Sequence, residues 1–412
     1  MGARRSRLPL AILGAVAAAG AATLLLRPRG GLVEPASVSV EAYFSAAQLD
    51  RAEDFRGIQR LIGLGGLAVT GTTLLLLAAR PPRRLLDPLS RRPILGGAAA
   101  GAGISLVLEA TGLPLSAVAH DRAHDVGLST QSWGPWLSDL AKSAALGTVF
   151  AAAGGAVSMA LVRRFRRNWW LPGAGIVVAF GVITIWLFPV VIDPLFNRFE
   201  PLREGPLRAQ VLELAERADV DVGKVLRVDA SRRTTGVNAY VNGIGPTKRI
   251  VLYDNLIDDL PREQVLQVVA HELGHQHHRD LSRGLLWLAL VAPAGTLLTQ
   301  RLAERFGRGA GLDDPGSRPG PVALPAIALA VAAVSFGLGC ASNLLSREVE
   351  ARADSFSLDL TADPAAHIAL ERRLAERNLS DPDPPALLHG LFGTHPTTLE
   401  RIGIGEAWAR DH

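Results

Sequence analysis

Seven long apolar runs, separated by polar stretches, set the pattern of the chain. They lie at 8–26, 58–79, 94–108, 143–162, 174–191, 284–299 and 321–340. A transmembrane α-helix takes about 20 predominantly apolar residues, so each run is a candidate membrane span. The third run, which can be extended to Val118, and the sixth are the shortest. The pattern predicts a mostly α-helical membrane protein with seven transmembrane helices.

Two polar segments interrupt this pattern. In the first, apolar residues at helical spacing predict an amphipathic helix over 206–218, and Pro261 suits the first turn of a later helix. Short β-like runs lie between them, at 224–228, 236–244 and 248–253. We therefore expect one polar domain with a small β-sheet, built from two separate segments. The expected division of the chain is 1–191 with spans one to five, 192–283, 284–345 with spans six and seven, and 346–412.

The composition agrees with a membrane location. Apolar residues make up 48% of the 412 residues, and the mean hydropathy is +0.22. Arg4 and Arg5 precede the first run as in a signal peptide, but Arg27–Pro28–Arg29 follows it where a small-residue cleavage site would be needed, which favours an uncleaved span. The single cysteine, Cys340, excludes a disulfide or a cysteine zinc site within the chain. Basic residues flank the spans, as contact with lipid headgroups requires, and no basic patch interleaved with aromatic residues indicates a nucleic-acid partner.

Candidate metal chemistry lies in the stretch VVAHELGHQHHRD, at 268–280. On a helix, His271 and His275 lie on one face, one turn apart, so both imidazoles can reach the same ion. Glu272 sits beside His271 and can serve as a general base on the open side of that ion. This H-E-x-x-H arrangement is typical of zinc peptidases.

The other two histidines of this stretch do not fit the same site. His278 shares the face, but it lies roughly 10 Å from His271 along the helix axis, at about 1.5 Å per residue. His277 points elsewhere on the helix. Position 281, where a longer zinc-protease pattern places a third histidine, is Leu281. A third ligand must come from another part of the chain.

The second polar segment offers that ligand in NLLSREVEARADSFSLDL, at 343–360. Glu348 and Glu350 are both candidates. Glu350 is followed one helical turn later by Asp354, which can accept the free N–H of a ligand histidine and fix its tautomer. Glu348 has no such partner, so the pattern favours Glu350. A solvated helix with surface ion pairs is the alternative, which the histidine motif disfavours.

These motifs together resemble the integral-membrane CAAX prenyl endopeptidase family of zinc metallopeptidases, whose relatives among the heat-shock membrane proteases share the shorter core. The resemblance rests on HELGH at 271–275 followed by SREVEARAD at 346–354. Further similar stretches are HDRAHDVGLSTQSWGPWLSD (120–139), IDPLFNRFEPL (192–202), SRRTTGVNAYVNGIGPTKRIVLYDNLI (231–257) and FGTHPTTLERI (392–402). The chain departs from the family at Thr397, where a second proline is common.

The resemblance implies a ring of seven helices around a water-filled chamber, with a gluzincin-like zinc domain at its rim. It implies that His271, His275 and Glu350 bind one zinc ion per chain, with Glu272 as the base. It also implies that Asn238, Ala239 and Tyr240 lie on an edge strand that pairs with the substrate backbone. That agrees with the general way in which a peptide adds to an exposed strand.

Two side chains are implied to hold the oxyanion, Asn238 and His395. Pro396 restricts the backbone of His395 and so helps to fix its ring. We therefore expect a monomeric, multi-pass zinc metalloendopeptidase of the cell membrane, acting on peptide or membrane-protein substrates.

Two rival functions are weaker. In a site-2-type intramembrane protease the motif lies inside an apolar span and pairs with an Asp-Gly dipeptide, whereas here polar residues flank it and the chain has no such dipeptide. A zinc-binding chaperone or transporter subunit without proteolytic activity would not need Glu272.

The side of the membrane and the substrate are less constrained. Slightly more basic residues lie on the N-terminal side of the seven spans, which by the positive-inside rule favours a zinc domain outside the cytoplasm. The resemblance implies the cytoplasmic side, and we expect that side because the charge bias is small. The richness in arginine and alanine is typical of a high-GC bacterial source, in which prenylated CAAX proteins are unusual. General turnover of membrane proteins or peptides is therefore the expected role.

Overall fold

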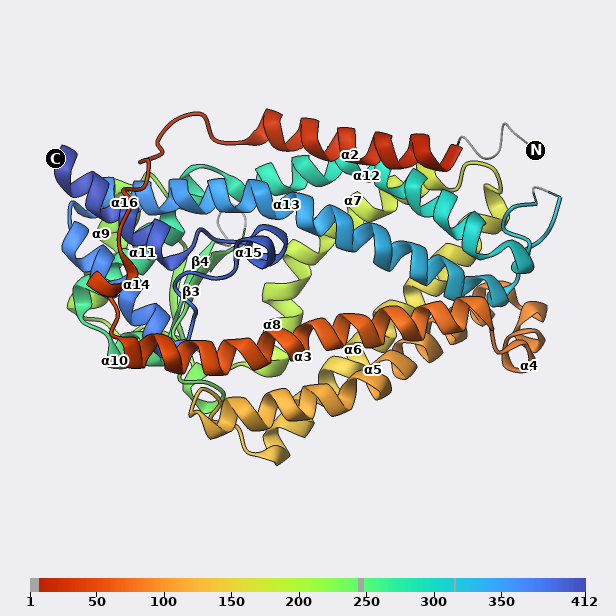
Figure 1. The fold of residues 1–412 in the computed structure, drawn as a ribbon, viewed down its shortest axis with the longest axis horizontal. Coiled ribbons are helices and arrows are strands. Elements are labelled where there is room, and N and C mark those ends of the chain that lie inside the picture. The colour runs from red at the N-terminus through yellow and green to blue at the C-terminus, as the bar shows by residue number, and fades with distance from the viewer. Residues whose placement is uncertain (1–6, 244–247, 315) are drawn as a thin grey trace.

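A computed structural model describes residues 7–243, 248–314 and 316–412, so Arg4 and Arg5 lie outside the described residues. Seven helices of the described chain are long and apolar enough to cross a membrane, which confirms the prediction. They are α2 (Arg7–Leu26), α3 (Ala46–Ala79), α5 (Pro93–Asp125), α6 (Trp133–Arg164), α7 (Trp170–Leu187), α12 (Asp280–Phe306) and α13 (Leu324–Thr361). Figure 1 shows the strands and most of the shorter helices gathered at one end of these long helices.

Three of the long helices continue well past their apolar parts. α3 begins behind a capping box in which Ser45 and Gln48 satisfy each other's backbone N–H groups. α5 runs through Pro114 for 33 residues, so the third apolar run is shorter than the helix that contains it. α13 extends for 38 residues from the membrane part into the second polar segment. It therefore joins the membrane helices rigidly to the polar domain.

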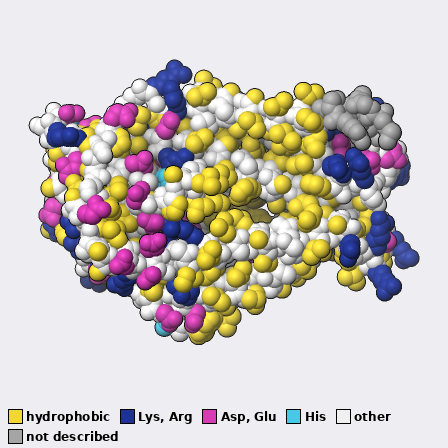
Figure 2. All heavy atoms as spheres, viewed as in Figure 1, with side chains coloured by type: hydrophobic (Ala, Val, Ile, Leu, Met, Phe, Trp, Pro, Cys, Tyr) yellow, Lys and Arg dark blue, Asp and Glu magenta, His cyan; other side chains and the backbone are white. Residues whose placement is uncertain are grey.

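The long helices form two groups. α5 and α6 approach closely at glycines: a Cβ at Gly101 would lie 2.2 Å from the Ala151 carbonyl oxygen, and one at Gly155 would lie 2.2 Å from that of Gly97. In the other group, α12 packs against α2, α7 and α13. Figure 2 shows apolar side chains spread over both groups, with the surface hollowed between them. The water-filled chamber that the resemblance implies stays a prediction.

The groups are joined away from the sheet by a shared apolar core. Two short elements lie at that end, α4 (Arg83–Leu86) and a 3₁₀ turn at Pro88–Arg91. The core takes residues from α4, α5, α6, α12 and α13: Leu86, Ala100, Met159, Val162, Ala303 and Ala330 are among its buried members.

The polar domain contains a four-stranded sheet of order β1-β2-β4-β3. The strands are β1 (Phe199–Pro201), β2 (Lys224–Val228), β3 (Ala239–Asn242) and β4 (Arg249–Tyr253). β2 and β4 are parallel, while β1 and β3 pair antiparallel at the two edges. The three predicted runs contain β2, β3 and β4, but β3 is shorter than its run, whose last residue, Ile244, lies outside the described residues. The three-residue β1 was not predicted.

The helices of this domain come from both polar segments. They are α9 (Pro206–Arg217), α10 (Asp254–Asp259), α11 (Arg262–His277), α14 (Pro364–Arg377), α15 (Ala386–Phe392) and α16 (Thr398–Asp411); a further short helix, α8 (Asp193–Phe196), follows a π-helical turn after α7. One core combines Val265, Val269 and Leu273 of α11 with Leu360 and Leu370 of the second segment. The two segments thus pack as one body, while the exact four-part division of the chain stays a prediction.

Polar contacts tie this body to α3 and to the loop between α5 and α6. Arg56 of α3 donates to the Leu379 carbonyl at 2.7 Å, just past the end of α14. The loop between α5 and α6 pairs with the chain before β3, where Thr235 N–H donates to the Leu128 carbonyl at 3.1 Å. The second contact holds the chain just before β3 against the loop between α5 and α6.

Candidate active site

Three potential metal ligands converge where α11 meets α13. His271 Nε2 lies 3.2 Å from His275 Nε2 and 3.1 Å from Glu350 Oε2, and His275 Nε2 lies 3.6 Å from Glu350 Oε1. Two atoms bound at about 2.0–2.1 Å to a tetrahedral zinc ion are about 3.3 Å apart. The three predicted ligands therefore have the chemistry and the spacing that zinc requires. α11 can present both histidines because its opposite face is apolar and buried.

A buried carboxylate supports His271. Asp354 Oδ1 lies 2.8 Å from His271 Nδ1, and the Asp354 side chain is fully buried. Arg401 of α16 binds the same carboxylate with two N–H groups, at 2.8 and 2.6 Å. The pairing leaves His271 Nε2 directed at the ligand cluster, as the spacing of Glu350 and Asp354 predicts.

His275 has a carboxylate of its own, which the sequence patterns did not single out. Asp280 Oδ2 lies 3.1 Å from His275 Nδ1. Asp280 is five residues after His275, and a helix would place it on another face. The helix instead ends, and Arg279 takes a left-handed conformation (φ 55°) that turns Asp280 back toward His275. In the sequence, the only sign of this contact is that an acidic residue follows the motif closely.

Glu272 is half-buried and lies beside the ligands, next to β3. Burial raises its pKa, and the two neighbouring histidines counteract part of that effect. The backbone N–H of Val241 donates to this carboxylate. A carboxylate thus lies beside both the potential metal ligands and an edge strand.

The register of β3 shows which backbone groups face outward. Tyr253 N–H donates to the Asn238 carbonyl at 3.1 Å, so residues 238, 240 and 242 face β4. The backbone N–H and carbonyl groups of Ala239 and Val241 then face the open edge. The Ala239 N–H is taken by the Asn238 side chain at 2.9 Å, and Gln276 reaches the Val241 carbonyl at 3.4 Å. The Ala239 carbonyl is left as the main open acceptor beside the site.

Of the predicted strand residues, Tyr240 points away from this edge. Its hydroxyl bonds to Asp193, after α7, and burial raises its pKa. Its backbone N–H and carbonyl groups face β4. Asn238 instead lies at the mouth of a cavity of about 400 Å³ that His395 and Arg401 also line.

His395 reaches the ligand cluster from the opposite side. Its Nε2 lies 3.3 Å from Glu350 Oε2, and its side chain is 55% exposed. Thr394 Oγ1 lies 2.9 Å from its Nδ1. Thr397, the departure from the resembled family, caps α16 by a capping box with Glu400 and so replaces a rigid proline with a hydrogen-bonded start. Asn238 and His395 thus line one cavity, and His395 also contacts the ligand candidate Glu350.

A second group of potential donors lies behind the site: Asp354, His367 and Glu371. The Arg401 guanidinium occupies the space among them, donating to Glu371 at 2.8 Å as well as to Asp354. Burial lowers the pKa of His367 to about 4 and raises that of Glu371 to about 7. We read this group as an arginine-filled support of the site and not as a second metal centre.

His277 and His278 face away from the ligand cluster. His277 Nδ1 lies 2.8 Å from the Ala218 carbonyl oxygen, and its ring packs on Phe356. Burial and Arg352 lower the pKa of His278 to about 4. Both contacts agree with the reach argument, which gave neither residue a ligand role.

Two family models match the chain. "Peptidase family M48" matches residues 201–408, and "CAAX prenyl protease N-terminal, five membrane helices" matches residues 73–198. The first covers β2, β3, β4, α11, α13 and most of α16. It therefore includes the three proposed ligands, Glu272, Asn238 and His395.

Individual relatives agree. The chain is 33% identical over 304 residues to the "Uncharacterized metalloprotease YhfN" of Bacillus subtilis, covering 74% of this chain and 71% of that protein. It is 33% identical over 235 residues to a rice "CAAX prenyl protease 1 homolog", spanning 56% of this chain and only 54% of the rice protein. The crystal structure of Saccharomyces mikatae Ste24p matches with a TM-score of 0.71 over 97% of this chain and 98% of that chain, at 19% identity. That last likeness concerns the fold alone.

Proposed function

The chain belongs to peptidase family M48 and is a multi-pass membrane metalloendopeptidase, and from this premise we propose that it uses one zinc ion held by His271, His275 and Glu350. The observation that carries the proposal is the convergence of three ligand atoms at 3.1–3.6 Å beside the half-buried Glu272. When bound, zinc supplies Lewis acidity toward a peptide carbonyl and activates water.

The side chains divide the remaining work. Glu272 takes a proton from the attacking water and returns it to the leaving amine. Asn238 and His395 donate to the oxygen on which negative charge develops, because both line one cavity and His395 also contacts Glu350. The edge of β3 binds the substrate backbone through Ala239.

We propose peptides and membrane-associated proteins as the substrates, cleaved without a requirement for prenylation. This proposal is supported by the arrangement in Figure 1, where α11 and the strands lie at one end of the long apolar helices, within reach of a membrane-bound chain. We further propose a monomer, with the zinc domain on the cytoplasmic side as the family resemblance implies.

The test substitutes Glu272 by Gln. The purified variant should retain one zinc per chain and lose hydrolysis of a peptide that the parent cleaves. Glu263→Gln is the matched control, because Glu263 is an exposed residue in the first turn of the same helix. Unchanged hydrolysis in Glu272→Gln would disprove its role as base. An inactive parent that binds zinc would instead support the alternative, a zinc-binding chaperone or transporter subunit. If the parent is active, Glu272→Gln can also trap substrates for identification.

A further inference from the structure

The contacts of Asp280 link three helices around one ligand. Its Oδ2 lies 3.1 Å from His275 Nδ1. Its Oδ1 accepts from Arg283 at 2.7 Å and from Arg352 at 2.5 Å. Asp280 opens α12, His275 belongs to α11, and Arg352 belongs to α13, two residues after Glu350. The set therefore fixes one ligand histidine relative to the helix that carries the ligand glutamate.

The environment of this set is that of a built support and not of a surface ion pair. The side chains of Asp280 and Arg352 are 9% and 7% exposed. A buried carboxylate with one oxygen held by two arginines can turn only the other oxygen to the imidazole. An acceptor at Nδ1 keeps the proton there and leaves Nε2 with its lone pair toward the ligand cluster.

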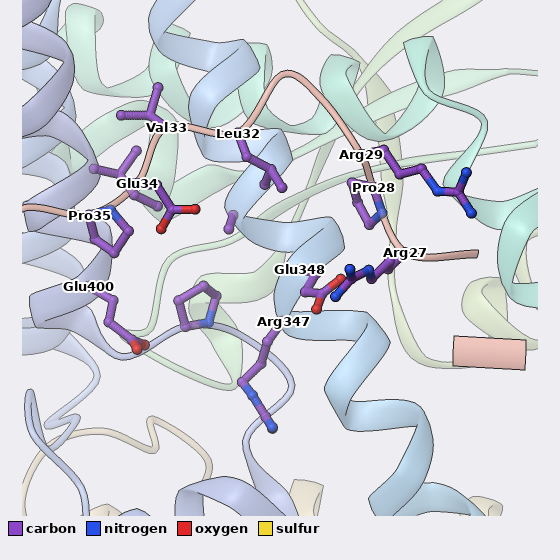
Figure 3. Close-up of a pocket in the computed structure, with 13 residues that line it drawn as sticks. Arg27, Pro28, Arg29, Leu32, Val33, Glu34, Pro35, Arg347, Glu348 and Glu400 are labelled. Atoms are coloured by element: carbon purple, nitrogen blue, oxygen red, sulfur yellow. The ribbon is translucent and has the colours of Figure 1, made fainter. Parts of the chain in front are cut away.

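The segment after the first span covers Arg352. A Cβ at Gly31 would lie 3.9 Å from Arg352 Cγ, and Val33 N–H donates to Ser355 Oγ on the next turn of α13 at 3.0 Å. Figure 3 shows Leu32, Val33 and Glu34 of this segment along the side of α13, bordering a cavity of about 510 Å³. Farther on, Ala36 N–H donates to the Gly403 carbonyl at 2.9 Å. The segment is thus fastened over the helix turn that holds Asp280.

We propose that Asp280 is a positioning residue for His275, and that Arg352 holds Asp280 in the orientation which this requires. The inference rests on the proposed zinc site. It gives the two ligand histidines parallel supports: Asp354 with Arg401 behind His271, and Asp280 with Arg352 behind His275.

The test compares zinc affinity, measured by competition with a chelating dye, with kcat and KM for a cleaved peptide. In Asp280→Asn, the two arginines bind the one remaining oxygen, and the NH₂ group turns toward His275. This NH₂ group cannot accept a hydrogen bond from His275 Nδ1. Zinc affinity should fall about 10- to 100-fold, with KM within about threefold of the parent. Asp280→Glu should recover part of the loss.

A matched control carries the same change in an exposed pair. Asp258 binds Arg227 at 2.7 Å, and its side chain is 58% exposed, so Asp258→Asn should leave zinc affinity unchanged. Zinc binding in folded Asp280→Asn within about twofold of the parent overturns the inference, as does an equal loss in Asp258→Asn.

Should Asp280→Asn fail to fold, Arg352→Lys decides the matter. Lysine keeps the charge but reaches less far toward Asp280, so this variant should bind zinc about three- to tenfold more weakly. Zinc affinity equal to that of the parent overturns the inference. Failure of the proposed function is seen separately. A chain that binds zinc more weakly in Asp280→Asn but never cleaves a peptide refutes the peptidase activity and leaves the positioning role standing.

Discussion

A bound substrate should depend on one backbone N–H more than on any other. The register of β3 leaves the Ala239 carbonyl as the open acceptor, because the outward groups of Val241 already contact Glu272 and Gln276. In antiparallel addition, the substrate residue opposite Ala239 donates its N–H there. N-methylation of that single substrate position removes the donor.

The size of the effect follows from burial. Ala239 is only 2% exposed, so water can do little to replace a missing donor to its carbonyl. Leaving a buried acceptor unpaired costs about 1–3 kcal/mol. Since each 1.4 kcal/mol is about a tenfold change, kcat/KM should fall about 5- to 150-fold.

The assay is a scan of a cleaved peptide in which each amide outside the scissile bond is methylated in turn. One position should be sensitive, and its two neighbours should change kcat/KM by less than about threefold because their N–H groups point away from β3. An ester at the sensitive position, which removes the donor without adding bulk, should reproduce the loss. A scan with uniform losses, or with no sensitive position, would refute strand addition at β3.

Three further outcomes are expected. Asn238→Ala and His395→Ala should each lower kcat more than they raise KM, because both donate mainly in the transition state; a change in KM alone would indicate ground-state binding. Folding lowers the pKa of His367 from its usual 6.5 to about 4. Its contribution to the stability of the folded state is therefore complete above pH 6.5 and is lost as the pH drops toward 4. Thermal unfolding in detergent should therefore show the parent losing on the order of 2 kcal/mol more than His367→Gln between pH 7.5 and 5, and equal losses would contradict the assignment. A reporter active only outside the cytoplasm should be silent when fused after His412 and active in the 80–93 loop; the reverse pattern would place the zinc domain outside.

The elements with long, regular patterns were predictable from the sequence. The seven apolar runs are long enough to predict helices by their length, and the spacing of His271 and His275 predicts one by its period. The structure forms helices at both. β1 was missed because three residues are too few to show a period. The ends of helices were missed where polar residues continue an apolar helix, as in α5 and α13.

The support behind the ligands was only half predictable. Asp354 follows Glu350 by one turn of the same helix, so helical spacing found it. Asp280 contacts His275 through a break in the helix at Arg279, a left-handed residue that helical spacing cannot anticipate. Arg401 comes from a distant helix and meets Asp354 only through the tertiary fold.

The most direct measurement is the zinc content of purified alanine variants. The parent, His277→Ala and His278→Ala should each contain one zinc ion per chain, because His277 and His278 contact other groups. His271→Ala, His275→Ala and Glu350→Ala should contain little or none. Full zinc in His275→Ala, or none in folded His278→Ala, would contradict the ligand assignment.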